Sequence, residues 1–254
     1  MEKLENLPRE SFFQKEHFET FLPSKFERND KEILQERKDV QLRLLELHDE
    51  LYPEIKKKKW NIDKHNSEEH LVSGIDISNP FIANKLSSIW LHYGKTDKEI
   101  KGYQKLVDEK SKESFINHIR LQVIISNQRR EKKYVVGFWL VIGKNDGSVW
   151  DRDSINKKLK SDSVFTERFF ELVTSLGDNY FVEVNNEVQD NKSFESVEDF
   201  KSFILKDNRR NYFIIGKDYA PNAKEVFEEN IVNTALEEFS RLYPIYELVK
   251  HRLS

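Results

Sequence analysis

The chain has 254 residues, a net charge of −3 and no cysteine. The lack of cysteine excludes disulfides, thiolate metal ligands and a cysteine nucleophile, and a chain of this length can bury a large core without cross-links. Neither the first residues nor any later stretch is apolar enough for a signal peptide or a membrane span, so we expect a cytoplasmic protein.

The first predicted element is a long amphipathic helix over residues 32–52. Its apolar residues recur with helical spacing: Ile33, Val40, Leu44, Leu47 and Leu51. Such a stripe is typical of a helix that buries one face. It predicts an interface that buries Leu44 and Leu47, either within the chain or with a second copy of it. Pro53 is expected to end or bend the helix.

Two further helices are expected in the N-terminal half. Asn79 followed by Pro80 is a typical helix start, and apolar residues follow with helical spacing until Gly94. Thr96 and Glu99 then have the spacing of a capping box, which predicts a helix from there to about residue 113.

The pattern changes to strands near residue 118. Apolar residues alternate with polar ones in much of residues 119–126, and residues 134–142 are nearly all apolar. These segments read as two strands, the second more buried than the first. Since the connecting residues 127–133 are polar or charged, we expect an antiparallel hairpin with a charged tip.

The remaining residues predict a mixture of helices and strands. Helices are expected over residues 163–176 and 197–205 and from Asn222 to Leu242, and strands over residues 179–184 and 211–215. The predicted fold class is therefore α+β. A helical region, residues 1–115, precedes a β-rich region, residues 116–254, with a mixed or antiparallel sheet of four or more strands and helices packed on it. Both regions can belong to one continuous domain.

Two histidine patterns suggest chemistry but fit ordinary roles better. His65 and His70 are five residues apart, about 140° away from the shared helix face that a zinc motif requires, so a polar loop is expected. Arg43 and His48 have a spacing that resembles that of the HEPN ribonucleases. That class is all-helical, which the β-rich second half of this chain does not match.

Acidic residues near position 180 resemble a nuclease metal site. Asp178 opens a predicted strand that contains Glu183, and Glu187 and Gln189 follow. Nucleases of the restriction-endonuclease superfamily hold Mg²⁺ with an Asp and a Glu, followed two residues later by Lys or, less often, Gln. The resemblance implies a Mg²⁺-dependent nuclease. The chain departs from that family at residues 185–186, where two Asn replace an apolar strand, and the alternative is an exposed strand end and turn.

Basic residues gather next to predicted strands and in one further segment. The groups are Arg129, Arg130, Lys132 and Lys133 at the hairpin tip, Arg209 and Arg210 before a strand, and Lys157, Lys158 and Lys160. Trp139, Trp150 and Tyr212 are close in sequence and can stack on bases. The main hypothesis is a protein that binds DNA or RNA through the basic hairpin.

Three alternatives to this hypothesis remain open. The first is the Mg²⁺-dependent nuclease around Asp178. The second is a protein-interaction module that forms a homo-oligomer through residues 32–52. The third is a hairpin whose charges only keep it soluble.

Overall fold

The computed structural model describes residues 6–253 apart from residues 26–27, 29, 65–71, 74–85, 108–112, 114, 130–131 and 144–149. For residues 72–73, 116, 127–129 and 132–133 it describes the backbone alone. His65, His70, Asn79 and Pro80 therefore lie outside the described residues.

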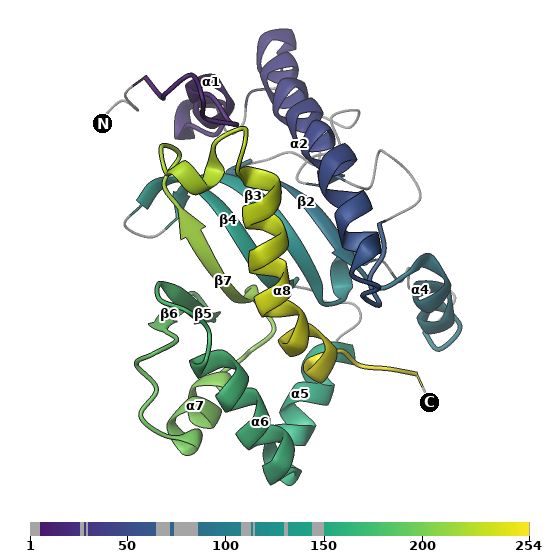
Figure 1. The fold of residues 1–254 in the computed structure, drawn as a ribbon. Helices are drawn as coiled ribbons and strands as arrows, with labels where there is room; N and C mark the ends of the chain where they lie inside the picture. Colours follow the sequence, from purple (N-terminus) through teal and green to yellow (C-terminus); the bar gives the residue numbers. More distant parts are fainter. Residues whose placement is uncertain are drawn as a thin grey trace.

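The described strands form one antiparallel sheet, in which seven strands follow the order β1-β2-β3-β4-β7-β5-β6 (Figure 1). The strands are β1 (Val72–Ser73), β2 (Ser88–Gly94), β3 (Arg120–Arg129), β4 (Lys132–Ile142), β5 (Tyr180–Val184), β6 (Glu187–Asp190) and β7 (Phe213–Tyr219). β7 is the last of them in the chain, yet it lies between β4 and β5.

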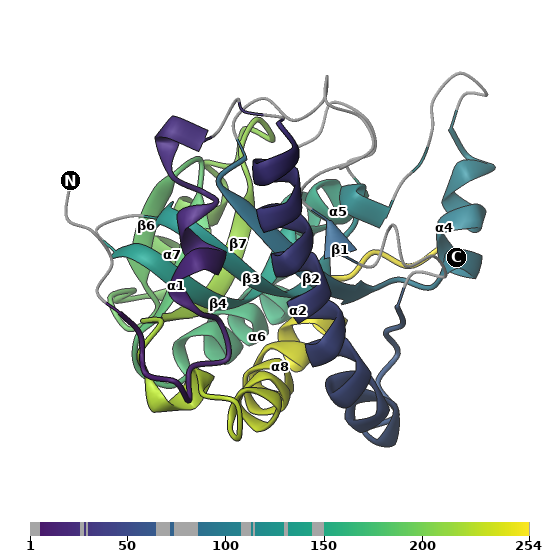
Figure 2. The ribbon, with the colours of Figure 1, turned by 90° about the horizontal axis from the view of Figure 1, so that it is seen from above.

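The described helices pack on one face of this sheet and beside it. They are α1 (Lys15–Glu19), α2 (Lys31–Lys57), α4 (Asp97–Gln104), α5 (Trp150–Ser161), α6 (Ser163–Thr174), α7 (Val197–Ile204) and α8 (Ile231–Val249). α8 and the end of α2 lie on the same side of the strands (Figure 2), while α5, α6 and α7 gather at one end of the molecule (Figure 1). None of these helices combines the length and apolar character needed to cross a membrane. The predicted α+β class is confirmed.

Helix α2 buries the stripe that its sequence predicts. Asp30 caps its first turn by accepting a hydrogen bond from the Ile33 N–H (3.3 Å). Leu44 and Leu47 are fully buried in the main core, which α8 and β2 also line, so this face of α2 is occupied within the chain. The helix continues past Pro53 to Lys57, so the proline does not end it.

The helix predicted up to Gly94 is wrong in its second part, because residues 88–94 form β2. Ile89, Leu91 and Tyr93 alternate toward the helices and are buried. β2 pairs with β3, so the sheet includes strands from both sides of residue 115. The capping box of Thr96 and Glu99 is confirmed at the start of α4.

The hairpin and most of the later elements follow the prediction. The β3–β4 hairpin is confirmed, and so are strands at β5 and β7 and helices at α6 and α7. The last helix begins at Ile231 rather than near Asn222, because residues 224–226 first form a separate 3-10 turn. Helix α5 and strand β6 have no counterpart in the prediction.

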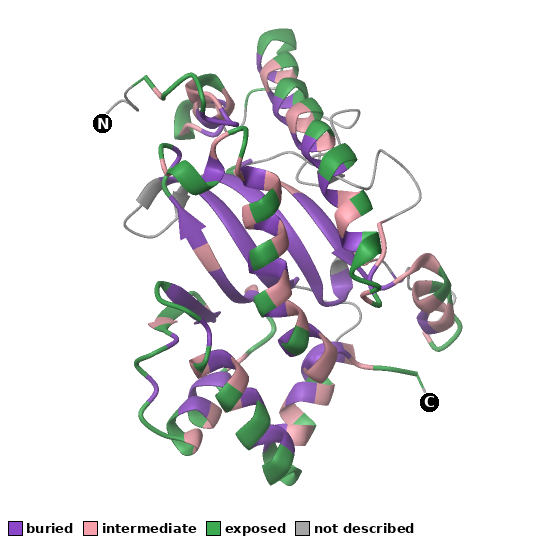
Figure 3. Cartoon of the chain, viewed as in Figure 1, coloured by how far each residue is buried: buried purple, intermediate pink, exposed green. Residues whose placement is uncertain are grey.

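The core lies mainly between the sheet and α2 and α8, and the strands are buried along most of their length (Figure 3). Phe239 of α8 packs edge-on against Phe138 of β4 (6.5 Å between ring centroids) and against Tyr93 of β2 (6.1 Å). On the opposite face of the sheet, the described residues form a second, smaller apolar cluster in which none belongs to a helix.

Candidate functional site

The sheet face opposite α2 and α8 carries polar and aromatic side chains. On β3, Arg120, Gln122 and Ile124 alternate with residues that face the helices. Because residues directly opposite each other in a sheet share a face, the register places Trp90 of β2 beside Ile124 and Trp139 of β4 beside Gln122. Arg120 and Gln122 are only 2% and 3% exposed, so this polar row is buried rather than solvent-facing.

The indole of Trp139 is fixed on this face by its neighbours. Gly216 lies directly opposite it on β7, and Gly137 lies two residues before it. A Cβ atom at either glycine would come within 2.5 Å of the indole, so only glycine leaves room for this ring. The indole Nε1–H donates to Asp218 Oδ1 at 2.8 Å, and Phe181 packs edge-on against the ring. Trp139 is therefore held in one orientation.

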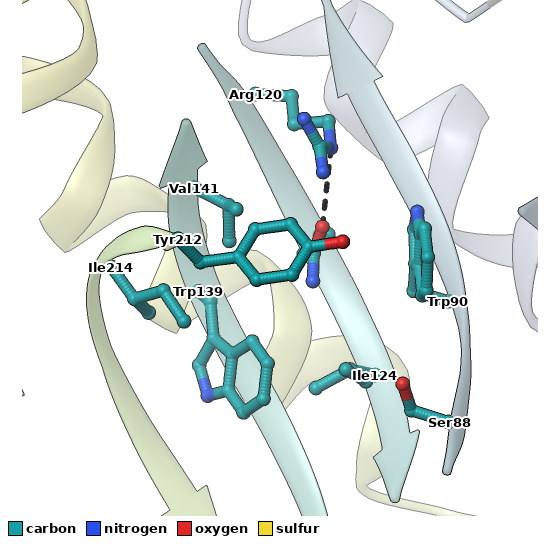
Figure 4. A pocket seen from close by; sticks show the side chains of 9 residues that line it. Ser88, Trp90, Arg120, Ile124, Trp139, Val141, Tyr212 and Ile214 are labelled. Carbon is teal, nitrogen blue, oxygen red and sulfur yellow. Dashed lines mark hydrogen bonds between the residues drawn. The ribbon is translucent and has the colours of Figure 1, made fainter. Parts of the chain in front are cut away.

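A hollow of about 280 Å³, counted with its open mouth, lies beside Trp139 (Figure 4). Its lining residues are Ser88, Trp90, Arg120, Gln122, Ile124, Trp139, Val141, Tyr212 and Ile214. Tyr212 and Trp90 are half-buried and form the rim, whereas Trp139 is buried and forms part of the floor. Figure 4 shows the Tyr212 ring extending across the hollow toward Trp90.

Arg120 brings a buried positive charge to the hollow. Its Nε–H donates to Gln122 Oε1 at 3.2 Å (Figure 4), and its Nη1 donates to the His118 carbonyl at 3.4 Å. Burial lowers the pKa of Arg120 to about 10, although the nearby Tyr212 opposes this shift. Arg120 is therefore still charged at neutral pH, and a buried cation favours an anionic or electron-rich ligand.

Arg152 of α5 anchors the loop that carries Tyr212. Its guanidinium donates to Asp207 Oδ1 (3.0 Å), to the Ile142 carbonyl (3.3 Å) and to the Asn211 carbonyl. These bonds tie the residues before β7 to α5 and to the end of β4. The rim of the hollow is therefore built on rigid elements.

No protein-family model and no curated protein matches this chain. Its function must therefore be inferred from the site itself.

The predicted basic residues Arg209 and Arg210 lie in the loop that leads to Tyr212, one of the residues that line the hollow. Arg209 forms an exposed ion pair with Asp153 of α5. Arg210 is exposed, and its backbone N–H donates to Asn208 Oδ1 at 2.9 Å. Both side chains are therefore on the surface, in the loop that leads to the rim.

The predicted basic hairpin is present as backbone, with Arg129 paired to Lys132 at its end. Arg130 and the side chains of Arg129, Lys132 and Lys133 lie outside the described part of the chain. The tip is five residues of β3 beyond Ile124, which corresponds to roughly 17 Å at about 3.4 Å per residue. A nucleic-acid strand can bridge that distance.

The four acidic and amide candidates do not gather at one point. β5 and β6 form a hairpin in which Val184 pairs with Glu187 and Val182 with Gln189, whereas Asp178 precedes the other end of β5. That end lies roughly 13 Å away along the strand at about 3.3 Å per residue, too far for Asp178 and Glu187 to share one ion. Glu183 points to the other face of the β5–β6 hairpin from Glu187 and Gln189.

Local interactions account for these residues. Glu187 pairs with Lys206 at 2.8 Å on the surface. Asn185 and Asn186 both have positive φ values (54° and 65°) and form the two-residue turn of the hairpin, a conformation that Asn tolerates well. Among the described residues, no group of three or more His, Asp or Glu side chains is placed to hold a metal ion.

Arg43 and His48, the pair with HEPN-like spacing, have structural partners. Arg43 donates to the Phe12 carbonyl (2.9 Å) and pairs with Glu46 and Glu228. His48 is hydrogen-bonded to the Tyr93 hydroxyl at 2.9 Å in the core. Both residues therefore fasten α2 to other parts of the fold.

One buried charged cluster has no counterpart in the sequence prediction. Lys95 Nζ donates to both carboxylate oxygens of Asp151 (2.9 and 3.1 Å) and lies 2.9 Å from His118 Nδ1. Burial alone would raise the pKa of Asp151, but the His118 hydrogen bond and the Lys95 charge hold it well below its ordinary value. The backbone N–H groups of Ile119 and His251 donate to the same carboxylate.

This cluster, too, has a structural role. The Lys95 and Asp151 side chains are at most 1% exposed, so a substrate has no access to them. Asp151 links the start of α5 to the ends of β2 and α8 and to the residue that precedes β3. Asp151 therefore holds these segments together at one end of the sheet.

Proposed function

We propose that this protein binds single-stranded DNA or RNA and docks one unstacked base in the hollow beside Trp139. The observation that carries the proposal is the fixed indole of Trp139 in a hollow that also contains Arg120, with Tyr212 and Trp90 at the rim. Proteins that bind single strands combine aromatic rings for the bases with positive charge for the backbone.

The size of the hollow favours one base over a duplex. The 280 Å³ of the hollow includes its open mouth, so it can take no more than part of a single base, which can enter only if it leaves the stack. Since stacking on an aromatic ring tolerates any base, Tyr212 and Trp90 at the rim suit a strand with varied sequence.

Phosphate contacts are expected from the basic residues on either side of the hollow. Arg209 and Arg210 lie just before Tyr212 at one side, and the β3–β4 hairpin with Arg129, Arg130, Lys132 and Lys133 lies toward the other. Such contacts fix the strand without reading its sequence.

The test is binding of labelled single-stranded oligonucleotides of about 12 nucleotides, followed by fluorescence anisotropy at low salt. Tyr212→Ala is expected to weaken binding roughly 5- to 100-fold, since stacking contributes about 1–3 kcal/mol per base. Tyr212 is half-buried and stands outside the strands, so this change tests the rim with little effect on the core.

Trp60→Ala is the matched control. Trp60 is also half-buried, but it stacks on Tyr243 of α8, on the helix side of the sheet (4.9 Å between ring centroids). Its loss is expected to leave the affinity unchanged. Equal affinities for the wild-type protein and Tyr212→Ala would remove the hollow from the interface. No binding of any single strand at low salt would refute the proposal.

A further inference from the structure

We infer that the bound strand leaves the hollow along the exposed face of α5, where Lys157 and Lys160 bind its phosphates. This inference rests on the proposed function and adds to it the path of the strand. It follows from where α5 begins and from which of its residues face outward.

Helix α5 begins beside the hollow. Its first residues bond to three residues that adjoin, in sequence, residues lining the hollow. These bonds join Asp151 to the Ile119 N–H, and Arg152 to the carbonyls of Ile142 and Asn211. The helix then runs on for 12 residues at the end of the molecule where α6 and α7 also lie (Figure 1). A strand that leaves the hollow on this side therefore meets α5.

One face of α5 carries exposed lysines. Asp153, Lys157 and Lys160 follow one another at intervals of four and three residues, so they share a face of the helix, and all three are exposed. Lys158 differs, because it is half-buried and its ammonium group lies over the Phe165 ring (5.0 Å to the centroid). Lys157 and Lys160 form no ion pair with another described residue. These two cations are therefore available to phosphates.

Arg209 joins this face to the rim of the hollow. Its guanidinium pairs with Asp153, the first residue of the face, and Arg210 beside it is exposed. The positive charges therefore continue from the loop before Tyr212 onto α5. The seven residues from Asp153 to Lys160 span roughly 10 Å at 1.5 Å per residue, which is long enough to meet more than one phosphate of a strand.

The face ends where acidic side chains begin. Asp162, directly after α5, is exposed and caps α6 by accepting a hydrogen bond from the Phe165 N–H (2.9 Å), and Glu167 on α6 is exposed. Because carboxylates repel phosphates, contact with the strand is expected to end there. Contacts to phosphates hold a strand without reading its bases, so the α5 face is expected to bind strands of any sequence.

The experiment compares two double variants. Lys157→Ser with Lys160→Ser removes the cations of the α5 face, and Lys98→Ser with Lys101→Ser removes two exposed lysines with the same spacing on α4. Anisotropy with a labelled strand of about 12 nucleotides is measured at several salt concentrations. The α5 variant is expected to flatten the log–log salt slope by about 1.4, or about 0.7 for each contact, so the wild type should lose about sevenfold more affinity than this variant between about 50 and 200 mM salt. The α4 variant should keep the wild-type slope.

Asp153→Asn is expected to have the opposite effect. It removes the carboxylate that pairs with Arg209, which makes this cation available to the strand. Binding should become tighter, and the salt slope should steepen by up to about 0.7. Glu54→Gln is the control, because it makes the same change in charge at an exposed pair with Lys57 on α2. It is expected to alter neither quantity. Circular dichroism verifies that each variant is folded.

The outcomes separate this inference from the proposal on which it rests. If the α5 variant keeps the wild-type slope while Tyr212→Ala weakens binding, the path along α5 is wrong and single-strand binding stands. If the α4 variant flattens the slope as much as the α5 variant, the effect comes from net charge alone and the inference is also wrong. If the wild type binds no strand, single-strand binding itself fails.

Discussion

Trp139 and Gly216 face each other directly across β4 and β7, and the indole lies over the position where a side chain at residue 216 would begin. A Cβ there would be 2.3 Å from Trp139 Cδ1 and 2.8 Å from the Phe138 carbonyl oxygen. The lack of a side chain at Gly216 therefore allows the Trp139 indole to lie where it does.

Gly216→Ala is accordingly expected to destabilise the protein by about 1–3 kcal/mol, since a buried ring or a strand must shift to make room. Gly177→Ala is the control, because a Cβ at residue 177 meets nothing closer than 3.9 Å. Urea denaturation measures both. A change near zero for Gly216→Ala would contradict the fixed placement of Trp139.

Leu47→Ala is expected to lower the free energy of unfolding by about 2–4 kcal/mol, because Leu47 of α2 is fully buried and its removal leaves a cavity. Leu42, on the same helix, is 46% exposed. Leu42→Ala is expected to cost less than about 0.5 kcal/mol. Similar denaturation midpoints for the two variants would argue against the assignment of the buried stripe.

Asp151→Asn is expected to cost about 3–5 kcal/mol, because it leaves Lys95 buried beside a neutral group. Asp153, two residues later, forms an exposed pair with Arg209, so Asp153→Asn is expected to cost under about 1 kcal/mol. The double variant Lys95→Met, Asp151→Asn should recover part of the loss, since it removes the unpaired charge. Thermal denaturation monitored by circular dichroism measures the stability of the two single variants and the double variant.

Glu238 is expected to make the protein less stable as the pH rises from about 4.5 to 7. His17, His48 and His251 act in the opposite direction, because burial lowers their pKa values below the ordinary 6.5. Burial raises the pKa of Glu238 to about 7, against an ordinary value of 4.5, and the Tyr180 and Tyr219 hydroxyls donate to its carboxyl group. Between these pH values the folded protein holds a proton that the unfolded chain has lost. The contribution of Glu238 to the free energy of unfolding should therefore decrease across this range, by on the order of 1–3 kcal/mol.

Glu238→Gln should flatten this pH dependence, because glutamine remains neutral throughout. Glu237→Gln, at the exposed neighbouring position, should leave the dependence unchanged. Urea midpoints measured from pH 4.5 to 8 test both variants. The same pH dependence in the wild-type protein and in Glu238→Gln would contradict the prediction.

The basic hairpin is expected to control the salt dependence of nucleic-acid binding. Each phosphate contact contributes about −0.7 to the log–log salt slope on a single strand and about −0.9 on a duplex. Changing Arg129, Arg130, Lys132 and Lys133 together to Ser should flatten the slope by about two to three units and hardly affect folding. Filter binding at several salt concentrations measures the slope. An unchanged slope would exclude the hairpin from the interface without bearing on the hollow.

The sequence predicts those parts of the fold in which local pattern and tertiary environment agree. The stripe of α2 and the apolar run of β4 are examples. The pattern fails at β2, where Ile89 and Trp90 follow Leu86 with helical spacing while Ile89, Leu91 and Tyr93 also alternate. Only pairing with β3 selects the strand. Helix α5 has no clear apolar pattern in the sequence, because its few buried residues include Asp151 and Arg152, which do not resemble a core.

The candidate site is even less visible in the sequence. Trp139 and Tyr212 are recognisable as stacking residues, but their meeting in one hollow depends on the pairing of β4 with β7. Arg120 and Gln122 alternate with apolar residues, which normally indicates a solvent-exposed face. Their burial reflects the whole fold, and no local signal reports it.

The position of β7 has a consequence for how the protein is made. As the chain leaves the ribosome, β2, β3 and β4 can pair in sequence, and β5 can pair with β6, but the two groups remain unconnected until residues 213–219 emerge. Until then the open edges of β4 and β5 present unpaired backbone groups, which is where partly synthesised chains associate with one another. Nascent chains of this protein are therefore expected to be most open to edge-to-edge association before β7 emerges, whereas the finished molecule closes both edges with a single strand.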